Sequence, residues 1–254
     1  MISNNLISAI TTGKDREKVF IAGIGRFGAK VIHNLTKFRL PNIEYDDTAE
    51  IKAGSLAIVA IDDNKENILI AEKLIKEVKK SYKCVVGVYF DLCAEDNSRK
   101  IEKKLSSLKN KADTLIIGSV GSVHEEIIEF LVFLYLNKCN SEERNSMISN
   151  LSNNGFAYFN VVYDKEALHD IYSFSDFATF DTNLKCPLDT SDNLFVMLGY
   201  GSAFKLDLDG KIVFSSIEKH LHPNAKIYKF TFLSKRYSPN AIIIQFLVMR
   251  KVRN

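Results

Sequence analysis

The chain has 254 residues, a mass of 28.7 kDa and a formal net charge of +3, from 34 Lys and Arg against 31 Asp and Glu. Hydrophobic residues make up 46% and charged residues 26%, which is typical of a globular protein and excludes disordered, collagen-like and coiled-coil classes. The balanced charge also argues against a basic protein that binds nucleic acid, so no nucleic-acid partner is expected.

The N-terminal residues lack the basic start, long apolar core and cleavage pattern of a signal peptide, so a cytoplasmic protein is expected. The most apolar helical run, residues 127–136, includes Glu129 and has about half the length that a bilayer requires, which predicts no transmembrane segment. Four widely spaced cysteines without a CxxC pair predict reduced thiols and no metal site.

Residues 1–17 are polar and poorly patterned and are expected to form a flexible N-terminal arm. Residues 18–22 form a short apolar run that predicts a buried strand, and a glycine-rich turn follows. Apolar positions at helical spacing then predict a helix over residues 29–38, which ends before Pro41.

Further strands are predicted at residues 56–61, 84–90 and 113–117, with helices between them at 63–80 and 98–109. Asp63 and Glu66 have the spacing of a capping box at the start of the first of these helices. Alternation of strands and helices at this rhythm predicts an α/β fold, with a Rossmann-like parallel sheet and helices on both faces. With a further helix at 123–138, this domain is expected to span residues 18–138.

A polar stretch over residues 138–154 separates this domain from a smaller α+β domain, expected at 155–250. Strands are predicted there at 156–162, 194–198, 226–233 and 241–249, with a helix at 165–177. Residues 205–221 are ambiguous, because Asp209 and Gly210 favour a hairpin turn whereas residues 210–221 also fit a helix.

The candidate site is the glycine-rich turn, which has the pattern GxGxxG between a strand and a helix. Such a turn lets the backbone approach a phosphate at the positive end of a helix, although a tight turn without a ligand also explains it. The ligand is then either a dinucleotide, with Glu44, Asp46 or Asp47 near the spacing that binds ribose, or a nucleoside triphosphate. The predicted phosphate-binding residues are Gly23, Gly25, Arg26, Phe27 and Gly28.

The order of several segments resembles the FtsZ/tubulin superfamily. Residues 84–90, 98–108 and 112–117 are similar to the strand, basic helix and VDTLIVI strand of FtsZ. Residues 186–189 (CPLD) resemble its SPLLD turn, and residues 222–227 (HPNAKI) resemble its DPDANI segment. The resemblance covers most of residues 18–250, and it favours a helix over about 209–221.

The same resemblance identifies departures at both halves of the hydrolytic site. Arg26 and Phe27 stand in a loop that is nearly all glycine in FtsZ, and residues 62–67, with three carboxylates and no glycine, replace its GGGTGTG loop. The synergy-loop motif NxDxxD, which activates water in FtsZ, falls on Lys138, Asn140 and Glu143, of which only Glu143 keeps a carboxylate. These positions are therefore predicted to be degenerate, and no catalytic residue is expected.

Three functional hypotheses follow. The first is a divergent, non-hydrolysing FtsZ-like protein that serves as a structural or regulatory interaction module in cytoplasmic cell division or cytoskeletal work. Its partner is a protein, either a true FtsZ filament or a second copy of this chain, and no cofactor is expected. The second is a GTP- or GDP-binding FtsZ-like protein that retains nucleotide without hydrolysis. The third is a regulatory protein that binds an NAD-type dinucleotide.

Overall fold

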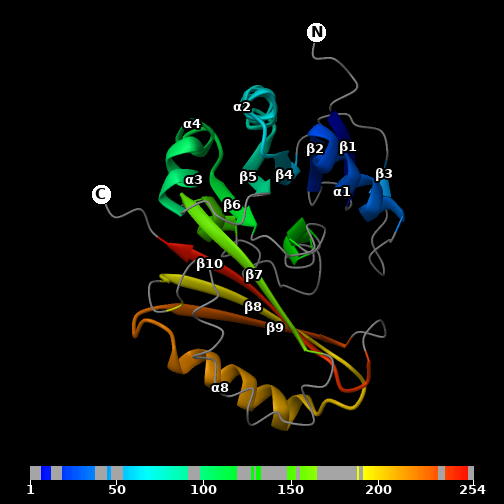
Figure 1. Cartoon of the computed structure of the whole chain (residues 1–254), viewed down its shortest axis with the longest axis vertical. Coiled ribbons are helices and arrows are strands. Elements are labelled where there is room, and N and C mark those ends of the chain that lie inside the picture. The colour runs from blue at the N-terminus through cyan, green and yellow to red at the C-terminus, as the bar shows by residue number, and fades with distance from the viewer. Residues whose placement is uncertain are drawn as a thin grey trace. The chain divides into compact units, whose positions relative to one another are not determined.

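A computed structural model describes residues 7–12, 19–37, 45–46, 54–90, 98–118, 127–128, 130–132, 148–152, 155–164, 188, 191–233 and 238–250. The chain divides into two compact units. The first comprises Met1–Ala157 with Lys251–Asn254, and the second comprises Tyr158–Arg250. The elements of both are labelled in Figure 1.

The first unit contains a sheet with the strand order β3-β1-β2-β4-β5-β6. The neighbouring pairs β2–β4, β4–β5 and β5–β6 are parallel, whereas β1 is antiparallel to both β2 and β3. The strands are β1 (Ile7–Thr12), β2 (Val19–Ile24), β3 (Tyr45–Asp46), β4 (Gly54–Asp62), β5 (Tyr82–Phe90) and β6 (Thr114–Gly118).

Four helices accompany this sheet: α1 (Gly25–Lys37), α2 (Lys65–Val78), α3 (Ser98–Lys104) and α4 (Ser106–Lys109). Helix α1 packs on β1, β2 and β4, whereas α2 packs on β4 and β5 and also contacts α4. All residues of β2 and β6 are buried, as in a parallel sheet that is covered on both faces. This architecture confirms the predicted α/β, Rossmann-like class.

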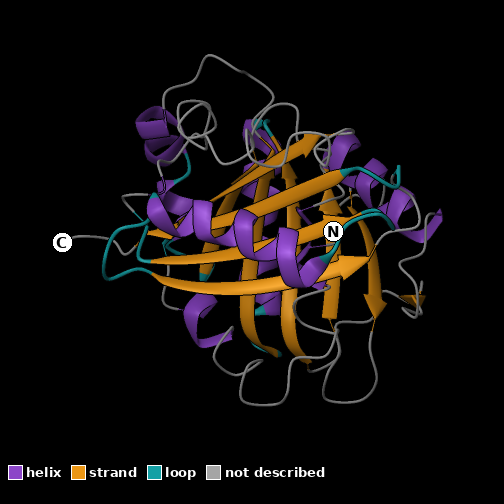
Figure 2. Cartoon of the chain, turned by 90° about the horizontal axis from the view of Figure 1, so that it is seen from below, coloured by secondary structure: helices purple, strands orange, loops and turns teal. Residues whose placement is uncertain are grey.

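The second unit has the strand order β7-β10-β8-β9. Its strands are β7 (Phe156–Asp164, which begins in the first unit), β8 (Asn193–Tyr200), β9 (Lys226–Leu233) and β10 (Ile242–Arg250). Strand β8 is antiparallel to β10 and parallel to β9. The connection between β8 and β9 contains the π-helix η5 (Leu206–Gly210) and the helix α8 (Lys211–Lys219), which lies along this sheet in Figure 2.

Three local predictions are settled by these elements. Residues 206–219 are helical and form no hairpin, and the Asp209 carboxylate accepts a hydrogen bond of 2.7 Å from the N–H of Lys205, which precedes the helix. The N-cap of α2 is Asn64 rather than Asp63, since the Asn64 Oδ1 accepts from the Glu66 N–H at 2.9 Å. The predicted helix at 98–109 is divided at Leu105 into α3 and α4.

The expectation of a flexible arm over residues 1–17 is wrong for Ile7–Thr12, which form β1. Every residue of β1 pairs with a residue of β2. A six-residue segment of mixed polarity forms no stable strand on its own, and its β conformation depends on pairing with β2, which sequence patterning does not reveal. Strand β1 thereby occupies the edge of β2 that would otherwise be open.

Other predicted elements lie partly or wholly outside the described residues, including the helix at 165–177 and most of the helix at 123–138. The described residues of the latter, 127–128 and 130–132, are helical and buried. Within the described ranges, no helix is long and apolar enough to cross a membrane.

Candidate functional site

The carboxyl ends of β2, β4, β5 and β6 meet at one edge of the first sheet. Ile24 pairs with Ile61, and Phe90 pairs with both Asp62 and Gly118. Ligands of open parallel α/β sheets bind outside this end of the strands. We call this region the carboxyl edge. It comprises residues 23–28 and 62–67 together with Tyr89 and Lys104.

Backbone packing accounts for the glycines of the first turn. Gly25 has a φ of +83°, which a residue with a side chain rarely adopts. A Cβ on Gly23 would lie 2.1 Å from the Gly28 carbonyl oxygen, and a Cβ on Gly28 would lie 3.0 Å from the Gly23 carbonyl carbon. Gly23 and Gly28 therefore let α1 approach β2 closely, which is the role of the last glycine in a GxGxxG turn.

The Asp62 carboxylate lies inside this turn. Its Oδ1 accepts a hydrogen bond of 2.6 Å from the Gly28 N–H, in the first turn of α1. A Cβ placed on Gly25 would lie 2.5 Å from Asp62 Oδ2 and 2.3 Å from Asn67 Nδ2. The Asp62 side chain therefore provides a negative charge at the positive end of α1, where this kind of turn otherwise holds a phosphate. Asp62 and Asn67 are only 8% and 7% exposed.

The second carboxylate of the loop, Asp63, is engaged by residues of two other elements. Lys104 of α3 forms an ion pair with Asp63 and also donates to the Tyr89 hydroxyl at 3.2 Å. Burial raises the pKa of the Asp63 carboxyl, but hydrogen bonds from Lys104 and Tyr89 outweigh that effect and hold the pKa below its ordinary value. The carboxyl edge therefore contains a lysine that is already neutralised by a carboxylate of the same chain.

The structure places some of the predicted site residues and leaves others outside the described part. Arg26 is exposed on the first turn of α1, and only the backbone of Phe27 is described. The synergy-loop positions Lys138, Asn140 and Glu143 lie outside the described residues. Among the described residues, the structure brings the glycines of the turn close to Asp62, at the end of β4, and to Asn67, near the start of α2.

The acidic residues proposed for a dinucleotide site are separated from the glycine turn. Asp46 belongs to β3, where it pairs with Thr11 of β1, so β1 lies between β3 and β2 in the sheet. In a dinucleotide fold this carboxylate stands at the end of a strand that directly neighbours the first one. Glu44 and Asp47 lie outside the described residues.

Sequence reasoning did not identify Asp62, Asn67, Tyr89 and Lys104 as neighbours of the glycine turn. It placed the acidic residues at the start of α2, whereas the Asp62 carboxylate in fact bonds to α1. The available signal was that Asp62 ends an apolar strand that is parallel to β2, and the carboxyl ends of the two strands coincide. The pairing of Asp63 with Lys104 spans 41 positions and has no local signal.

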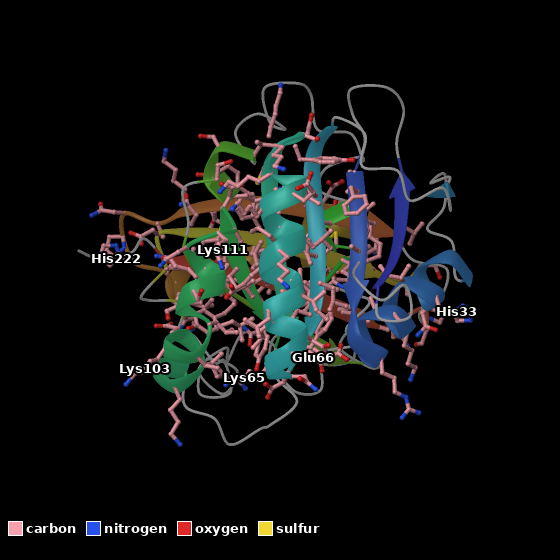
Figure 3. All side chains as sticks on the ribbon, turned by 90° about the horizontal axis from the view of Figure 1, so that it is seen from above. His33, Lys65, Glu66, Lys103, Lys111 and His222 are labelled. Atoms are coloured by element: carbon pink, nitrogen blue, oxygen red, sulfur yellow. The ribbon has the colours of Figure 1, made fainter. Side chains whose placement is uncertain are left out.

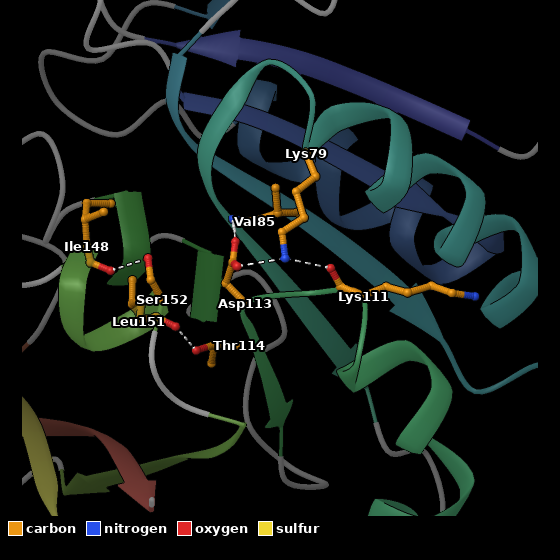
Figure 4. Close-up of polar contacts among 8 residues, drawn as sticks. All are labelled: Lys79, Val85, Lys111, Asp113, Thr114, Ile148, Leu151 and Ser152. Atoms are coloured by element: carbon orange, nitrogen blue, oxygen red, sulfur yellow. Dashed lines mark hydrogen bonds and ion pairs between the residues drawn. The ribbon is translucent and has the colours of Figure 1, made fainter. Parts of the chain in front are cut away.

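The opposite end of the strands, which we call the amino edge, is also held by polar contacts (Figure 4). The Asp113 carboxylate accepts from the Val85 N–H at 2.7 Å and from the Lys79 ammonium at 2.8 Å. Lys79 also donates to the Lys111 carbonyl oxygen at 3.1 Å, and the Thr114 hydroxyl donates to the Leu151 carbonyl oxygen. These contacts join α2, β5, β6 and the helical residues 148–152.

Two weakly acidic groups are buried at the amino edge. Burial raises the pKa of the Cys84 thiol to about 12, partly opposed by a hydrogen bond with Ser152. Burial also raises the pKa of the Tyr82 hydroxyl to about 12, and the hydroxyl has no hydrogen-bond partner in the structure. Neither group is ionised at neutral pH, so the thiol is not a reactive nucleophile.

Metal binding finds no support in the part of the chain that the structure describes, where no group of three or more His, Cys, Asp and Glu side chains could hold a metal ion. The carboxyl edge instead consists of backbone N–H groups, three carboxylates, two amides, a phenol, two ammonium groups and the Arg26 guanidinium.

Comparisons with known proteins identify the fold. No protein-family model matches the chain, and no curated protein sequence matches it significantly. Among solved structures, a mutant of FtsZ from M. jannaschii is 13% identical and superposes with a TM-score of 0.60 over 87% of this chain and 68% of that one. A GTPγS-bound protofilament of CetZ2 from Haloferax volcanii is 12% identical, with a TM-score of 0.55 over 89% of this chain and 70% of that one.

TubZ from Bacillus thuringiensis serovar israelensis, in GDP-form protofilaments, is 10% identical, with a TM-score of 0.50 over 77% of this chain and 62% of that one. The chain thus spans 62–70% of the length of these three structures. At these identities the likeness concerns the fold. This chain has the fold that these FtsZ, CetZ2 and TubZ structures share.

Proposed function

We propose that the protein is a non-hydrolysing FtsZ-like protein that acts in the cytoplasm as a structural or regulatory interaction module, in cell division or other cytoskeletal work. The observation that carries the proposal is the position of the Asp62 carboxylate, which accepts from the Gly28 N–H at 2.6 Å. A second anion at this turn would meet like-charge repulsion in a largely buried site. The chain's own carboxylate thus takes the place of a phosphate.

The loop after β4 supports the same proposal. Asp63 adds a second carboxylate whose pKa is lowered, despite burial, by hydrogen bonds with Lys104 and Tyr89, so it is ionised at neutral pH. Lys104, one of the cations at this edge, is not free to pair with an entering phosphate, because its charge is already balanced by Asp63. A phosphate that enters here would have to break the ion pair between Asp63 and Lys104, which costs free energy. A glycine-rich second loop contains no such pair to break.

The synergy-loop positions provide the second, independent argument. At Lys138 and Asn140 the residues present cannot act as the ionised carboxylates that orient and activate water. Loss of the phosphate-binding loop prevents nucleotide binding, whereas loss of the water-activating groups prevents the chemical step of hydrolysis. The combination favours a protein that works by contact with other proteins.

Self-association is part of the proposal, because neighbours with this fold are described as a dimer (FtsZ from M. jannaschii) and as a protofilament (CetZ2). Sedimentation velocity of the purified chain over a hundredfold concentration range measures it directly. A second candidate function, retention of GTP or GDP without hydrolysis, is favoured by neighbours described as GTPγS-bound and GDP-bound. A dinucleotide site is disfavoured, because β1 separates Asp46 from β2.

The decisive experiment measures nucleotide content and turnover together. The purified chain is denatured and the released small molecules are identified; the native chain is then heated with GTP, GDP and NADH. A ligand at 100 times its Kd raises the free energy of unfolding by about 2.7 kcal/mol, which shifts the melting temperature visibly. We expect no released nucleotide, no shift and no phosphate release at high protein concentration.

Two variants of Asp62 test whether its carboxylate is the reason that no nucleotide binds. Asp62→Gly removes both the charge and the bulk from the turn, whereas Asp62→Asn removes only the charge. If Asp62 blocks the turn, Asp62→Gly gains a thermal shift with GTP or pyrophosphate, and Asp62→Asn gains less. Guanine nucleotide released from the wild-type chain would instead establish the second candidate. Phosphate release that Glu143→Ala abolishes would overturn the proposal.

A further inference from the structure

The segments from α2 to β5 and from α3 to α4 carry a concentration of positive charge. Residues 65–90 contain six lysines against three glutamates, and residues 98–111 contain six Lys and Arg against one glutamate. These two stretches therefore carry a formal charge of +8, compared with +3 for the whole chain. The remaining residues of the chain carry the compensating negative charge, so the basic charge is localised.

Six of these lysines form what we call the basic face. All six are exposed, and none of them has an ion pair with a carboxylate of the described residues. Figure 3 shows Lys65 on α2 and Lys103 on α3, and α2 is also in contact with α4. The basic face consists of Lys65, Lys73, Lys76, Lys83, Lys100 and Lys103.

The basic lysines differ from the lysines that hold the fold together. Lys79, Lys104 and Lys111 each form an ion pair with a carboxylate from another element. Their partners are Asp113, Asp63 and Glu72, so these three charges are neutralised within the unit. The unpaired lysines contribute no such contact and instead leave a surface of one sign that attracts an acidic partner.

An exposed leucine lies among these lysines. Leu69 is 53% exposed, and positions 65, 69, 73 and 76 follow one another at helical spacing along the outer side of α2. An apolar side chain with charged residues around it is the arrangement of a protein interface, in which the centre loses water and the rim stays solvated. The phosphates and sugars at the surface of a nucleic acid provide no matching apolar group for Leu69.

The residue types at the face also favour a protein partner. Glu66 and Glu77 are exposed on the same helix, and a uniformly anionic surface of phosphates or headgroups would be repelled by both. The face has lysines in place of the arginines that pair with guanine, and no exposed aromatic side chain for base stacking is found among the described residues of α2 to α4. A protein segment with mixed side chains tolerates both glutamates.

We infer that the basic face, with Leu69 between Lys65 and Lys73 on α2, is a docking surface for an acidic protein segment that carries an apolar residue between carboxylates. The inference rests on the proposed role as an interaction module and names the chemistry of its partner. The long lysine side chains gain ion pairs along about four turns of helix, and Leu69 gains an apolar contact.

The test uses the full chain and a fluorescent synthetic peptide of repeating Glu-Glu-Leu-Glu units, with anisotropy as the readout at low salt. Lys73→Glu/Lys76→Glu is compared with Lys211→Glu/Lys219→Glu, which makes the same charge change on exposed positions of α8. Leu69→Ser is compared with Leu208→Ser, since Leu208 is 58% exposed on η5. Circular dichroism verifies that each variant is folded.

We expect the double change on α2 to weaken peptide binding about tenfold or more, because two attractions become repulsions, and the change on α8 to weaken it less than about twofold. Leu69→Ser is expected to weaken peptide binding about fivefold, and Leu208→Ser is expected to leave it unchanged. Equal losses in each matched pair would overturn the inference, as would binding to phosphatidylserine vesicles or duplex DNA that exceeds peptide binding. Nucleotide binding is measured separately, so failure here leaves the proposed function intact.

Discussion

The carboxyl edge and the amino edge of the first sheet are held by the same kind of contact. At the amino edge, the Asp113 carboxylate accepts from the Val85 N–H and from Lys79. At the carboxyl edge, Asp62 accepts from the Gly28 N–H, and Asp63 pairs with Lys104. In both places a carboxylate satisfies a backbone donor of a neighbouring element, and a lysine balances a carboxylate charge.

The two edges differ in what folds of this class normally place there. The amino edge is structural in such folds, whereas the carboxyl edge is where ligands bind. In this chain the carboxyl edge has the same kind of contacts as the amino edge, and the Asp62 carboxylate is the anionic group at the glycine turn. The comparison teaches that close helix–strand packing by itself accounts for a glycine-rich turn of this kind, so the turn alone does not identify a nucleotide site.

The largest effect is expected from Gly23→Ala, which tests the packing role of the turn. The new Cβ would lie 2.1 Å from the Gly28 carbonyl oxygen. Relieving this clash requires the backbone of α1 or β2 to move, which costs more free energy than moving a side chain. We expect a loss of about 3 kcal/mol in the free energy of unfolding, measured by urea denaturation. Gly210→Ala is the control, because its Cβ meets only the end of the Leu206 side chain at 3.0 Å. Equal losses would show that Gly23 is not a packing residue.

Asp62→Ala and Asp113→Ala compare the two edges directly. Each removes a carboxylate that accepts from a backbone N–H, at 2.6 Å and 2.7 Å respectively. We expect each to cost about 1–3 kcal/mol in the same denaturation assay, because that N–H loses its acceptor. If Asp62 were instead strained in a ligand site, Asp62→Ala would be neutral or stabilising while Asp113→Ala remained costly. That result would restore the carboxyl edge as a binding site.

Alkaline pH is expected to destabilise the amino edge. The pKa values of Cys84 and Tyr82 are raised to about 12 from 9.0 and 10.0, so the folded chain holds protons that the unfolded chain releases. Their contribution to stability is complete below about pH 9 and is lost as the pH rises toward 12, at about 1.4 kcal/mol per pH unit for each group that titrates. Cys84→Ala should flatten this slope, and an unchanged slope would contradict it. The measurement is the urea midpoint at several pH values.

The smallest effect is expected from the Asp63–Lys104 pair. The folded pKa of Asp63 is below its ordinary value of 3.8, so the pair stabilises the fold above that value and this stability is lost as the pH falls below it. Lys104 is 40% exposed, which limits the contribution to less than about 1 kcal/mol. Lys104→Met should remove this part of the acid dependence, whereas Lys73→Met, at an unpaired lysine, should not. Chemical denaturation between pH 2.5 and 6 compares the two.

Much of the fold follows from local patterning. The prediction of strand β9 at residues 226–233 agrees with its observed bounds, and the buried runs that became β4, β5 and β6 were each located within two residues. Apolar runs of this length have few alternatives inside a globular chain, because only burial on both faces stabilises them. The glycine turn was also recognised, because a backbone with a φ of +83° at Gly25 requires glycine.

The sequence by itself thus determined the α/β class, the parallel strands and the glycine turn, since these depend on periodicity and on backbone freedom over a few residues. Only the tertiary structure decided what fills that turn. The bond from Gly28 to Asp62 spans 34 positions, the pair of Lys104 and Asp63 spans 41, and β1 becomes a strand only by pairing with β2. Such contacts form because parallel strands bring their carboxyl ends together in space, and no pattern within a single segment records which side chains meet there.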